Sequence, residues 1–368
     1  MVGTLRPEEI SSEHPLTTLL LDLRSTAQLT EIELNPLNID ETAALAAQVA
    51  GRLLTPDAAH QLFGETEGNP IFVMETMRAD LSKGVEAMGS ERLSFSPLSL
   101  PPKIQAVIQR RLAQLSPAAR ELASLAAVVG RSFTLNVLVQ TGDLTEDALV
   151  RALDELWQRR IVREQSTDLY DFSHDHIREV AYDAISPVRQ RLLHRRVAQA
   201  LETVHAMNLD AVSGQVAVHY EQAGLLEKAI LYYKQASGVA QRIYAIVEAI
   251  DHLRKALRLL KSLPSTPERS QQELDIQLTL GPFLETLKGY AAPEVEQVYT
   301  RAQELCQQIG DRQPQQLIWA LLGLRAHYFM RAEHGRAREV AEQLLTLVQS
   351  VHDPLLLAQA HRHLGTSL

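Results

Sequence analysis

Along most of the chain, hydrophobic side chains recur every three or four residues, which is the spacing of one face of an α-helix. The Leu-rich stretch 14–29 and the Ala- and Leu-rich stretches from residue 40 onward follow this pattern. Two stretches near the N-terminus, Met1–Leu5 and Leu29–Leu34, instead favour strands, and the second alternates with period two. Because two strands cannot bury a sheet by themselves, we interpret residues 1–36 as the C-terminal remnant of an α/β domain.

Residues 37–100 are expected to form a small helical domain. Asp40 is a candidate cap of its first helix, and Pro56 occupies the first position of its second helix. Gly68-Asn69-Pro70 interrupts the pattern and precedes a third helix at 71–82. The stretch 84–99 is rich in Gly, Ser and Pro and runs into a double proline, which predicts a domain boundary there.

Residues 101–205 follow a different order of elements. Pro117 begins and Gly130 ends one expected helix, and Leu149, Leu153 and Leu156 share one face of the next. Two β-like runs, 161–164 and 169–172, are joined by four polar residues and predict a hairpin. Further helices are expected from residues 174 and 187. This order, in which helices are followed by a hairpin, is typical of a winged helix.

Residues 206–368 repeat a spacing of small and large side chains. Gly224, Ala229, Tyr233 and Ala236 are separated by five, four and three residues, and this resembles the second half of a tetratricopeptide repeat. Small residues at such positions let paired helices approach closely. The same offsets recur in two further sets, Tyr244, Ala249, Leu253 and Ala256, and Ala332, Ala337, Ala341 and Leu344. The sequence therefore predicts a mainly α fold that ends in a helical repeat array.

Composition narrows the class of protein. The hydrophobic fraction of 45% is that of a globular chain, and 36 Lys and Arg against 45 Asp and Glu give a net charge of −9. This acidic balance argues against nucleic acid or an anionic membrane as a partner of the whole surface. Cys306 is the single cysteine, so no intrachain disulfide can form. No secretion signal or membrane-length apolar run is present, and we expect a cytoplasmic protein with no membrane partner.

Several motifs follow one another in a recognisable order. Leu5-Arg6-Pro7 comes after an expected strand, Glu67-Gly68-Asn69-Pro70 before a helix, and Phe172-Ser173-His174-Asp175 after the hairpin. Together with the repeats, this order resembles the C-terminal half of a STAND-type signalling ATPase, a relative of the AAA+ proteins. It is most similar to the large bacterial ATPases fused to nucleotide cyclases, kinases or transcription regulators.

The resemblance implies a nucleotide role for four residues. Arg6 corresponds to an Arg that senses the γ-phosphate, and Gly68 and Pro70 match a turn in a helical lid whose proline packs on adenine. His174 matches a histidine that approaches the β-phosphate of ADP, although Ser173 stands where the family has Met. From the residues alone, other interpretations stay open: a solvated charge for Arg6, a helix-starting proline for Pro70, and Asp175 as a helix cap beside a space-filling His174.

The phosphate-binding loop G-x-x-x-x-G-K-[ST] is absent from the 368 residues. We therefore expect that this chain does not hydrolyse ATP alone and that ATP or ADP binds only with a nucleotide-binding core encoded outside it. No catalytic constellation is recognisable. No metal site is predicted, because His174 and His176 lie two residues apart without a third ligand nearby.

Three functions remain open from the sequence. The first is the regulatory and sensor part of a signalling ATPase, which couples nucleotide state to a protein or ligand on the repeats. The second is a free-standing repeat scaffold that binds a protein or peptide and has no nucleotide role. The third is a DNA-binding regulator, for which a basic run is available, whereas acidic residues in 144–157 would repel a DNA backbone. The run comprises Arg189, Arg191, His194, Arg195 and Arg196.

Overall fold

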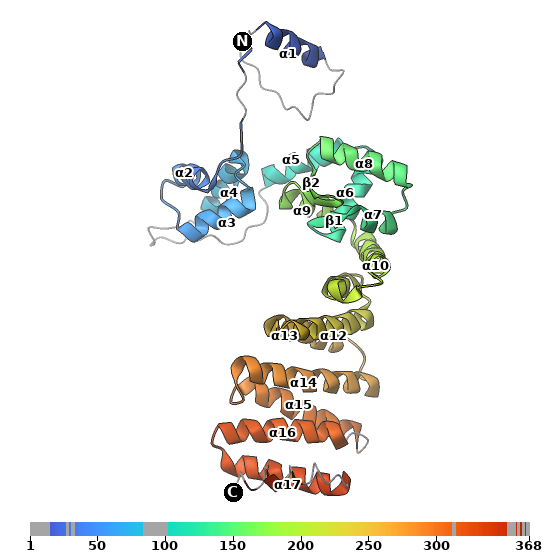
Figure 1. Cartoon of the computed structure of the whole chain (residues 1–368). Coiled ribbons are helices and arrows are strands. Elements are labelled where there is room, and N and C mark those ends of the chain that lie inside the picture. Colours follow the sequence, from blue (N-terminus) through green and yellow to red (C-terminus); the bar gives the residue numbers. More distant parts are fainter. Residues whose placement is uncertain are drawn as a thin grey trace. The chain divides into compact units, whose positions relative to one another are not determined.

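The computed structural model describes residues 15–26, 29–30, 34–83, 102–310, 314–351, 358, 361–362 and 365. The described residues are mainly helical, as predicted, and the chain divides into two compact units, Met1–Leu193 and His194–Leu368 (Figure 1). The division falls inside helix α10 (Pro187–Val204), earlier than the boundary expected after residue 205. Among the described residues, no helix has both the length and the apolar character required to cross a bilayer.

The expected α/β remnant falls largely outside the described residues. Met1–Leu5 and Arg6 both lie there, and the structure describes a helix, α1 (Pro15–Ser25), within the Leu-rich stretch. Of the second expected strand, Leu29, Thr30 and Leu34 are described, and none of them is in a strand. The side chain of Leu34 is 88% exposed. The assignment of residues 1–36 to an α/β domain therefore stays a prediction.

Three helices, α2 (Ile39–Ala50), α3 (Pro56–Thr66) and α4 (Pro70–Lys83), form what we call the three-helix domain. They pack around Ala46, Leu62, Val73 and Met77, which are buried. Asp40 was expected to cap α2, and this is wrong. The cap is Asn38, whose side chain accepts a hydrogen bond from the Glu41 N–H while Glu41 bonds back to the Asn38 N–H.

A helix-and-hairpin module follows from residue 102 to residue 183. Its antiparallel sheet has the order β1-β3-β2, and the predicted hairpin is confirmed, with Asp168 at φ 65° in the turn. The short elements β1 and α7 were not predicted. The elements are α5 (Pro102–Ala113), α6 (Pro117–Val129), β1 (Ser132–Thr134), α7 (Leu135–Thr141), α8 (Glu146–Gln158), β2 (Val162–Ser166), β3 (Leu169–Phe172) and α9 (Asp175–Asp183).

The second unit is a helical repeat array, and Figure 1 shows α12 to α17 stacked as successive layers. After α10, a short 3₁₀ turn (Leu209–Val212) leads into the array. Its helices are α11 (Ser213–Gln222), α12 (Leu226–Arg242), α13 (Ile246–Leu260), α14 (Pro267–Lys288), α15 (Pro293–Ile309), α16 (Pro314–Met330) and α17 (His334–Val351).

The five-four-three spacing seen in the sequence corresponds to one recurring turn. Gly224, Tyr244 and Ala332 all adopt left-handed backbone conformations, with φ of 76°, 60° and 58°. In each case the next N–H donates to the carbonyl five residues before it at 2.9 Å, which closes one helix before the next begins. The spaced residues that follow are buried between the paired helices, so the predicted repeat pattern is confirmed.

One tyrosine holds three consecutive helices of the array together. Tyr299 of α15 lies between Gly281 of α14 and Gly323 of α16. A Cβ atom added at Gly281 would lie 2.4 Å from the Tyr299 ring, and one added at Gly323 would lie 2.3 Å from it. The Tyr299 hydroxyl donates to Glu285 Oε1 at 2.7 Å, so the polar end of this buried side chain is satisfied.

Candidate functional site

The turn between α3 and α4 depends on a glycine. Glu67 and Gly68 are both in the left-handed region, at φ 47° and 72°. The Leu37 N–H donates to the Gly68 carbonyl at 2.9 Å, and a Cβ atom on Gly68 would lie 2.0 Å from the Leu37 carbonyl oxygen. The backbone of residue 37 thus leaves no room for a side chain at position 68.

Asn69 and Pro70 complete this turn and begin α4. The Asn69 side-chain oxygen accepts hydrogen bonds from the Ile71 and Phe72 N–H groups at 3.0 Å and 3.4 Å. Pro70 stands at the first helical position, where its missing N–H leaves nothing unsatisfied, and it is exposed. The helix-starting role of Pro70 is therefore observed, while its contact with adenine stays a prediction.

His174 is positioned by the end of the hairpin. Phe172 of β3 is fully buried, and the Ser173 hydroxyl donates to the carbonyls of Arg160 and Ile161. The Ser173 hydroxyl thus ties the end of β3 to the residues that precede β2. His174 follows in extended conformation, at φ −146°, as the residue that precedes α9.

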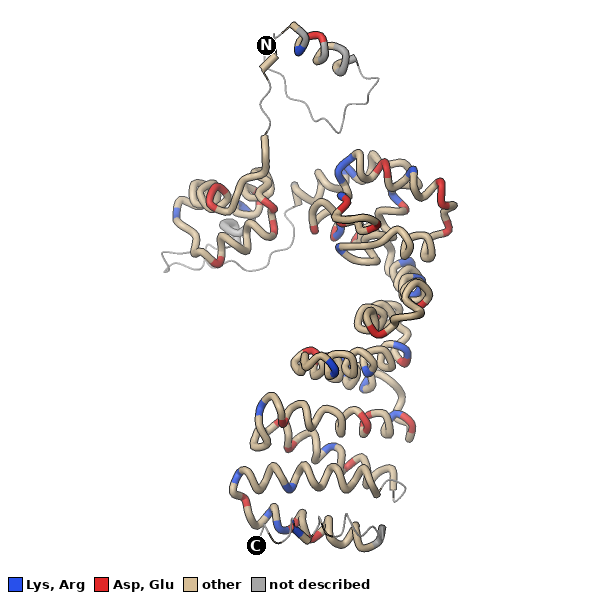
Figure 2. Tube along the Cα trace, in the orientation of Figure 1, with Lys and Arg blue, Asp and Glu red and all other residues tan. Residues whose placement is uncertain are grey.

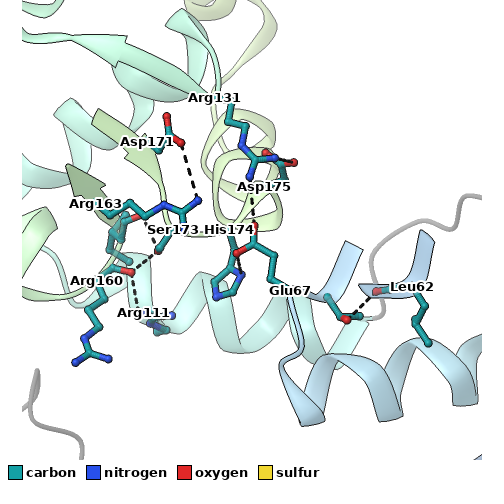
Figure 3. Close-up of polar contacts among 12 residues, drawn as sticks. Leu62, Glu67, Arg111, Arg131, Arg160, Arg163, Asp171, Ser173, His174 and Asp175 are labelled. Carbon is teal, nitrogen blue, oxygen red and sulfur yellow. Dashed lines mark hydrogen bonds and ion pairs between the residues drawn. The ribbon is translucent and has the colours of Figure 1, made fainter. Parts of the chain in front are cut away.

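The turn and the histidine are in contact through Glu67. His174 Nδ1 lies 3.1 Å from Glu67 Oε2, and Arg131 Nη2 lies 3.4 Å from Glu67 Oε1 (Figure 3). Arg131 also reaches Asp175 Oδ2 with its other terminal nitrogen, at 2.6 Å. One carboxylate of the three-helix domain therefore meets an imidazole and a guanidinium of the helix-and-hairpin module.

Burial decides the charge state of His174. Desolvation lowers the pKa of His174, the Glu67 carboxylate raises it, and the cationic Arg111 and Arg163 lower it further. The net shift is downward, so the ring is mainly neutral at pH 7 and carries one N–H donor. Two residues on, His176 shifts in the opposite direction, because its hydrogen bond to Glu179 raises its pKa.

Phe72 of α4 fixes the apolar side of both histidines. Its ring contacts His174 and His176 edge to face, with centroid distances of 5.8 Å and 6.2 Å. Phe72 itself is buried, while the side chain of His174 is 26% exposed. The imidazole is therefore held in place on one side and reaches solvent on the other.

Three of the four residues expected at the site lie in the part of the chain that the structure describes. Gly68 and Pro70 lie in the turn whose Glu67 contacts His174, whereas Arg6 lies outside the described residues. Glu67 and Arg131 were not predicted as site residues. Their contact joins positions 64 residues apart, so no local spacing in the sequence could predict it.

Two sequence interpretations need correction. Asp175 was a candidate cap of the helix after the hairpin, but the capping position is occupied by His174, and Asp175 pairs with Arg131. His194 was counted with a basic surface run. It is instead buried and shares a 2.9 Å hydrogen bond with His219, and burial lowers the pKa of His194 to about 4.

Of the predicted basic run, Arg189, Arg191 and Arg195 are exposed on α10. Arg189 pairs with Glu121 at 2.8 Å, and the exposed side of α8 carries Glu146, Asp147 and Asp154. Figure 2 shows acidic and basic positions interspersed along the helices of both units.

Within the described ranges, no group of three His, Cys, Asp or Glu side chains could hold a metal ion. Cys306 is buried, which raises the pKa of its thiol to about 11.

Comparisons with known proteins give partial matches. No protein-family model matches the chain. A Rhizobium meliloti (strain 1021) protein, "Uncharacterized protein R02095", is 30% identical over 337 residues, and the match spans 86% of this chain but 32% of that protein. The chain thus corresponds to about a third of the length of this relative.

Solved structures show more distant similarity. One is a Signal Transduction ATPase with Numerous Domains (STAND) protein with a tetratricopeptide repeat sensor, PH0952 from Pyrococcus horikoshii, with 13% identity and a TM-score of 0.33. That match covers 92% of this chain and 58% of the other. BtubC (BKLC) from P. vanneervenii has 15% identity and a TM-score of 0.29, over 66% of this chain and 92% of its own.

Proposed function

We propose that this chain is the regulatory and sensor part of a STAND-type signalling ATPase. In this proposal, residues 37–100 are the helical lid, 101–205 the winged helix and 206–368 the repeats that take up a protein or ligand. ATP or ADP binds to a core supplied outside these residues, and a partner on the repeats shifts the balance between nucleotide states.

The contact of His174 with the Glu67 turn is the observation that carries this proposal. A lid turn that contains Gly68 and Pro70 and a histidine that precedes α9 are separated by about a hundred residues in sequence, yet they meet at 3.1 Å. Residues of these two kinds are the ones that the resemblance assigns to adenine and to the β-phosphate. A nucleotide bound there would touch both elements at once.

The chemistry of the residues suits a nucleotide. Pro70 is exposed and has no N–H, so its ring can lie on a purine without leaving a donor unsatisfied. A neutral imidazole donates one N–H to a phosphate oxygen, and the negative charge of the phosphate then favours the protonated ring. Once protonated in this way, the His174 ring would bind ADP more strongly than the neutral ring does.

The first experiment is to read the DNA upstream of the Met1 codon for an in-frame G-x-x-x-x-G-K-[ST]. The extended protein is then titrated with ADP by calorimetry. We expect His174→Ala to weaken ADP binding roughly tenfold, the size of a lost hydrogen bond to a charged group. His60→Ala, on the exposed side of α3, is the matched control. Unchanged ADP affinity in His174→Ala would remove the proposed role.

A free-standing repeat scaffold is the second candidate. The turn between α12 and α13 and the start of α13 expose three apolar residues, Ile243, Tyr244 and Val247, which are 68%, 87% and 57% accessible. Such side chains on a repeat array are available to a protein or peptide. A stop codon and a ribosome-binding site directly upstream of Met1, together with partner binding that ADP does not affect, would favour the scaffold.

A further inference from the structure

The Glu67 carboxylate holds a position that suits an anionic ligand. Its two oxygens make separate contacts, Oε2 with His174 Nδ1 at 3.1 Å and Oε1 with Arg131 Nη2 at 3.4 Å. A phosphate group presents several oxygens on one centre in the same manner and favours the same donors. The donors belong to the helix-and-hairpin module, whereas the carboxylate comes from the turn of the three-helix domain (Figure 3).

Arginines and carboxylates both surround His174: Asp175 pairs with Arg131 at 2.6 Å, and Asp171 lies 4.0 Å from Arg163. Arg111 and Arg163, both on the helix-and-hairpin module, act on the His174 ring as positive charges, in addition to Arg131 beside Glu67. Arg111 donates to the Arg159 carbonyl at 2.9 Å, and this hydrogen bond holds its guanidinium in place.

Glu67 is the residue that ends α3, where its N–H donates to the Phe63 carbonyl at 2.7 Å. Glu67 ends α3 at φ 47° and ψ 34°, a left-handed conformation that a residue with a long side chain seldom adopts. Its side chain is about a quarter exposed, and that of Arg131 is about half exposed. A dissolved anion can therefore reach both groups that contact the carboxylate.

We propose that Arg131 and His174 form an oxyanion site, that Glu67 occupies it in the absence of ligand, and that the diphosphate of a nucleotide displaces Glu67. The assignment to a nucleotide rests on the function proposed above, whereas the oxyanion site itself does not. Displacement frees the turn at 67–70 from Arg131 and His174, so the ligand controls whether the two parts of the first unit stay joined through this carboxylate. Arg131 becomes a second phosphate-binding residue beside His174.

The test uses the 368-residue chain and inorganic pyrophosphate as the probe, titrated by calorimetry at low salt. Glu67→Gln removes the competing charge and keeps the size of the side chain. We expect it to bind pyrophosphate roughly tenfold more tightly than the unaltered chain, because the like-charge competitor is gone. Adding Arg131→Ala to Glu67→Gln should cancel this gain.

Two further variants keep the test decisive. Glu75→Gln removes a carboxylate of α4 that pairs with Arg78 at 3.0 Å, and it should bind pyrophosphate as the unaltered chain does. If Glu67→Gln does not fold, Glu67→Asn is used, since Asn is neutral and accepts a left-handed backbone. Binding by Glu67→Gln or Glu67→Asn that is no tighter than that of the unaltered chain, or no binding by any variant, overturns the proposal.

Failure of this inference and failure of the proposed function are distinguishable. If Glu67→Gln tightens pyrophosphate binding while ADP affinity of the extended protein does not depend on His174, the oxyanion site stands and the nucleotide function falls. If ADP affinity depends on His174 while Glu67→Gln changes nothing, Glu67 is not a competitor and the oxyanion inference falls.

Discussion

The two units of the chain hold their helices together in different ways. In the repeat array, Tyr299 fills the space above Gly281 and Gly323, and the fit is one of shape between buried groups. In the first unit, Glu67 of the turn at 67–70 meets Arg131, which precedes β1, and His174, which precedes α9. All three side chains are partly exposed and charged or titratable. Packing of the first kind is worth several kcal/mol, whereas an exposed ion pair contributes about 0–1 kcal/mol.

This difference indicates which contact can serve as a switch. A packed tyrosine has no alternative partner in water, so it makes neighbouring helices act as one body. A partly exposed carboxylate between a guanidinium and a neutral imidazole can be exchanged for another anion at little cost in free energy. We therefore expect ligand-dependent change at Glu67 and a constant arrangement of α14, α15 and α16. The predictions below test this contrast.

The largest effect is expected from Gly323→Ala. The new Cβ atom would lie 2.3 Å from the Tyr299 ring, so α15 or α16 must shift, at about 3 kcal/mol of unfolding free energy. Urea unfolding of the chain measures this loss. Gly238→Ala in α12 is the control, because nothing lies within 4 Å of its added Cβ and alanine favours the helix by up to about 1 kcal/mol. Equal stability of the two variants would contradict the packing account.

Gly68→Ala should be the next most harmful change. It combines a φ of 72° with a backbone oxygen 2.0 Å from the new Cβ atom, for a cost of about 2.5 kcal/mol concentrated in the three-helix domain. Hydrogen exchange in α3 and α4 is the measurement, and faster exchange is expected there. Gly64→Ala, which meets nothing within 4 Å, should leave exchange unchanged or slower. Equal rates of hydrogen exchange in α3 and α4 of the two alanine variants would contradict the account.

Acid should destabilise the repeat array through His194. Burial lowers the pKa of His194 to about 4, while the unfolded value is about 6.5. Between these values the unfolded chain binds more protons than the folded chain, so stability falls as pH falls. The loss is of order 2 kcal/mol between pH 7 and pH 4. His194→Gln should flatten this part of the stability profile, and a profile as steep as before would contradict the assignment.

The smallest effect concerns the pKa of His174 itself. Glu67 raises this pKa and Arg111 lowers it, so Glu67→Gln should move it down and Arg111→Gln should move it up. Two-dimensional NMR of the imidazole signals across a pH titration measures both changes. Shifts of the same sign in the two variants would show that Glu67 and Arg111 do not act on this ring as charges of opposite sign.

Local patterns in the sequence were sufficient for most of the elements. The five-four-three spacing found the turns at Gly224, Tyr244 and Ala332, because each set of four residues lies within about a dozen positions. Pro117 and Gly130 correctly marked the ends of α6 for the same reason. Asp40 was chosen over Asn38 as a cap, since both residue types cap well and only the side-chain geometry separates them.

The candidate site was predictable only in part. Gly68, Pro70 and His174 belong to short motifs that can be recognised by their order along the chain. Glu67 and Arg131 meet across 64 residues, and each is an ordinary surface residue in its own neighbourhood. Short elements such as β1 and α7 were not predicted, because three to seven residues are too few to establish a hydrophobic period.

The imidazole signal of His174 in the extended protein tests the central claim most directly. NMR spectra are recorded while ADP is added, and His60, whose Nδ1 contacts the Pro56 carbonyl at 2.9 Å, serves as an internal reference. The account predicts that the His174 signal moves as ADP saturates the protein while that of His60 stays in place. A His174 signal that does not respond to bound ADP would contradict it.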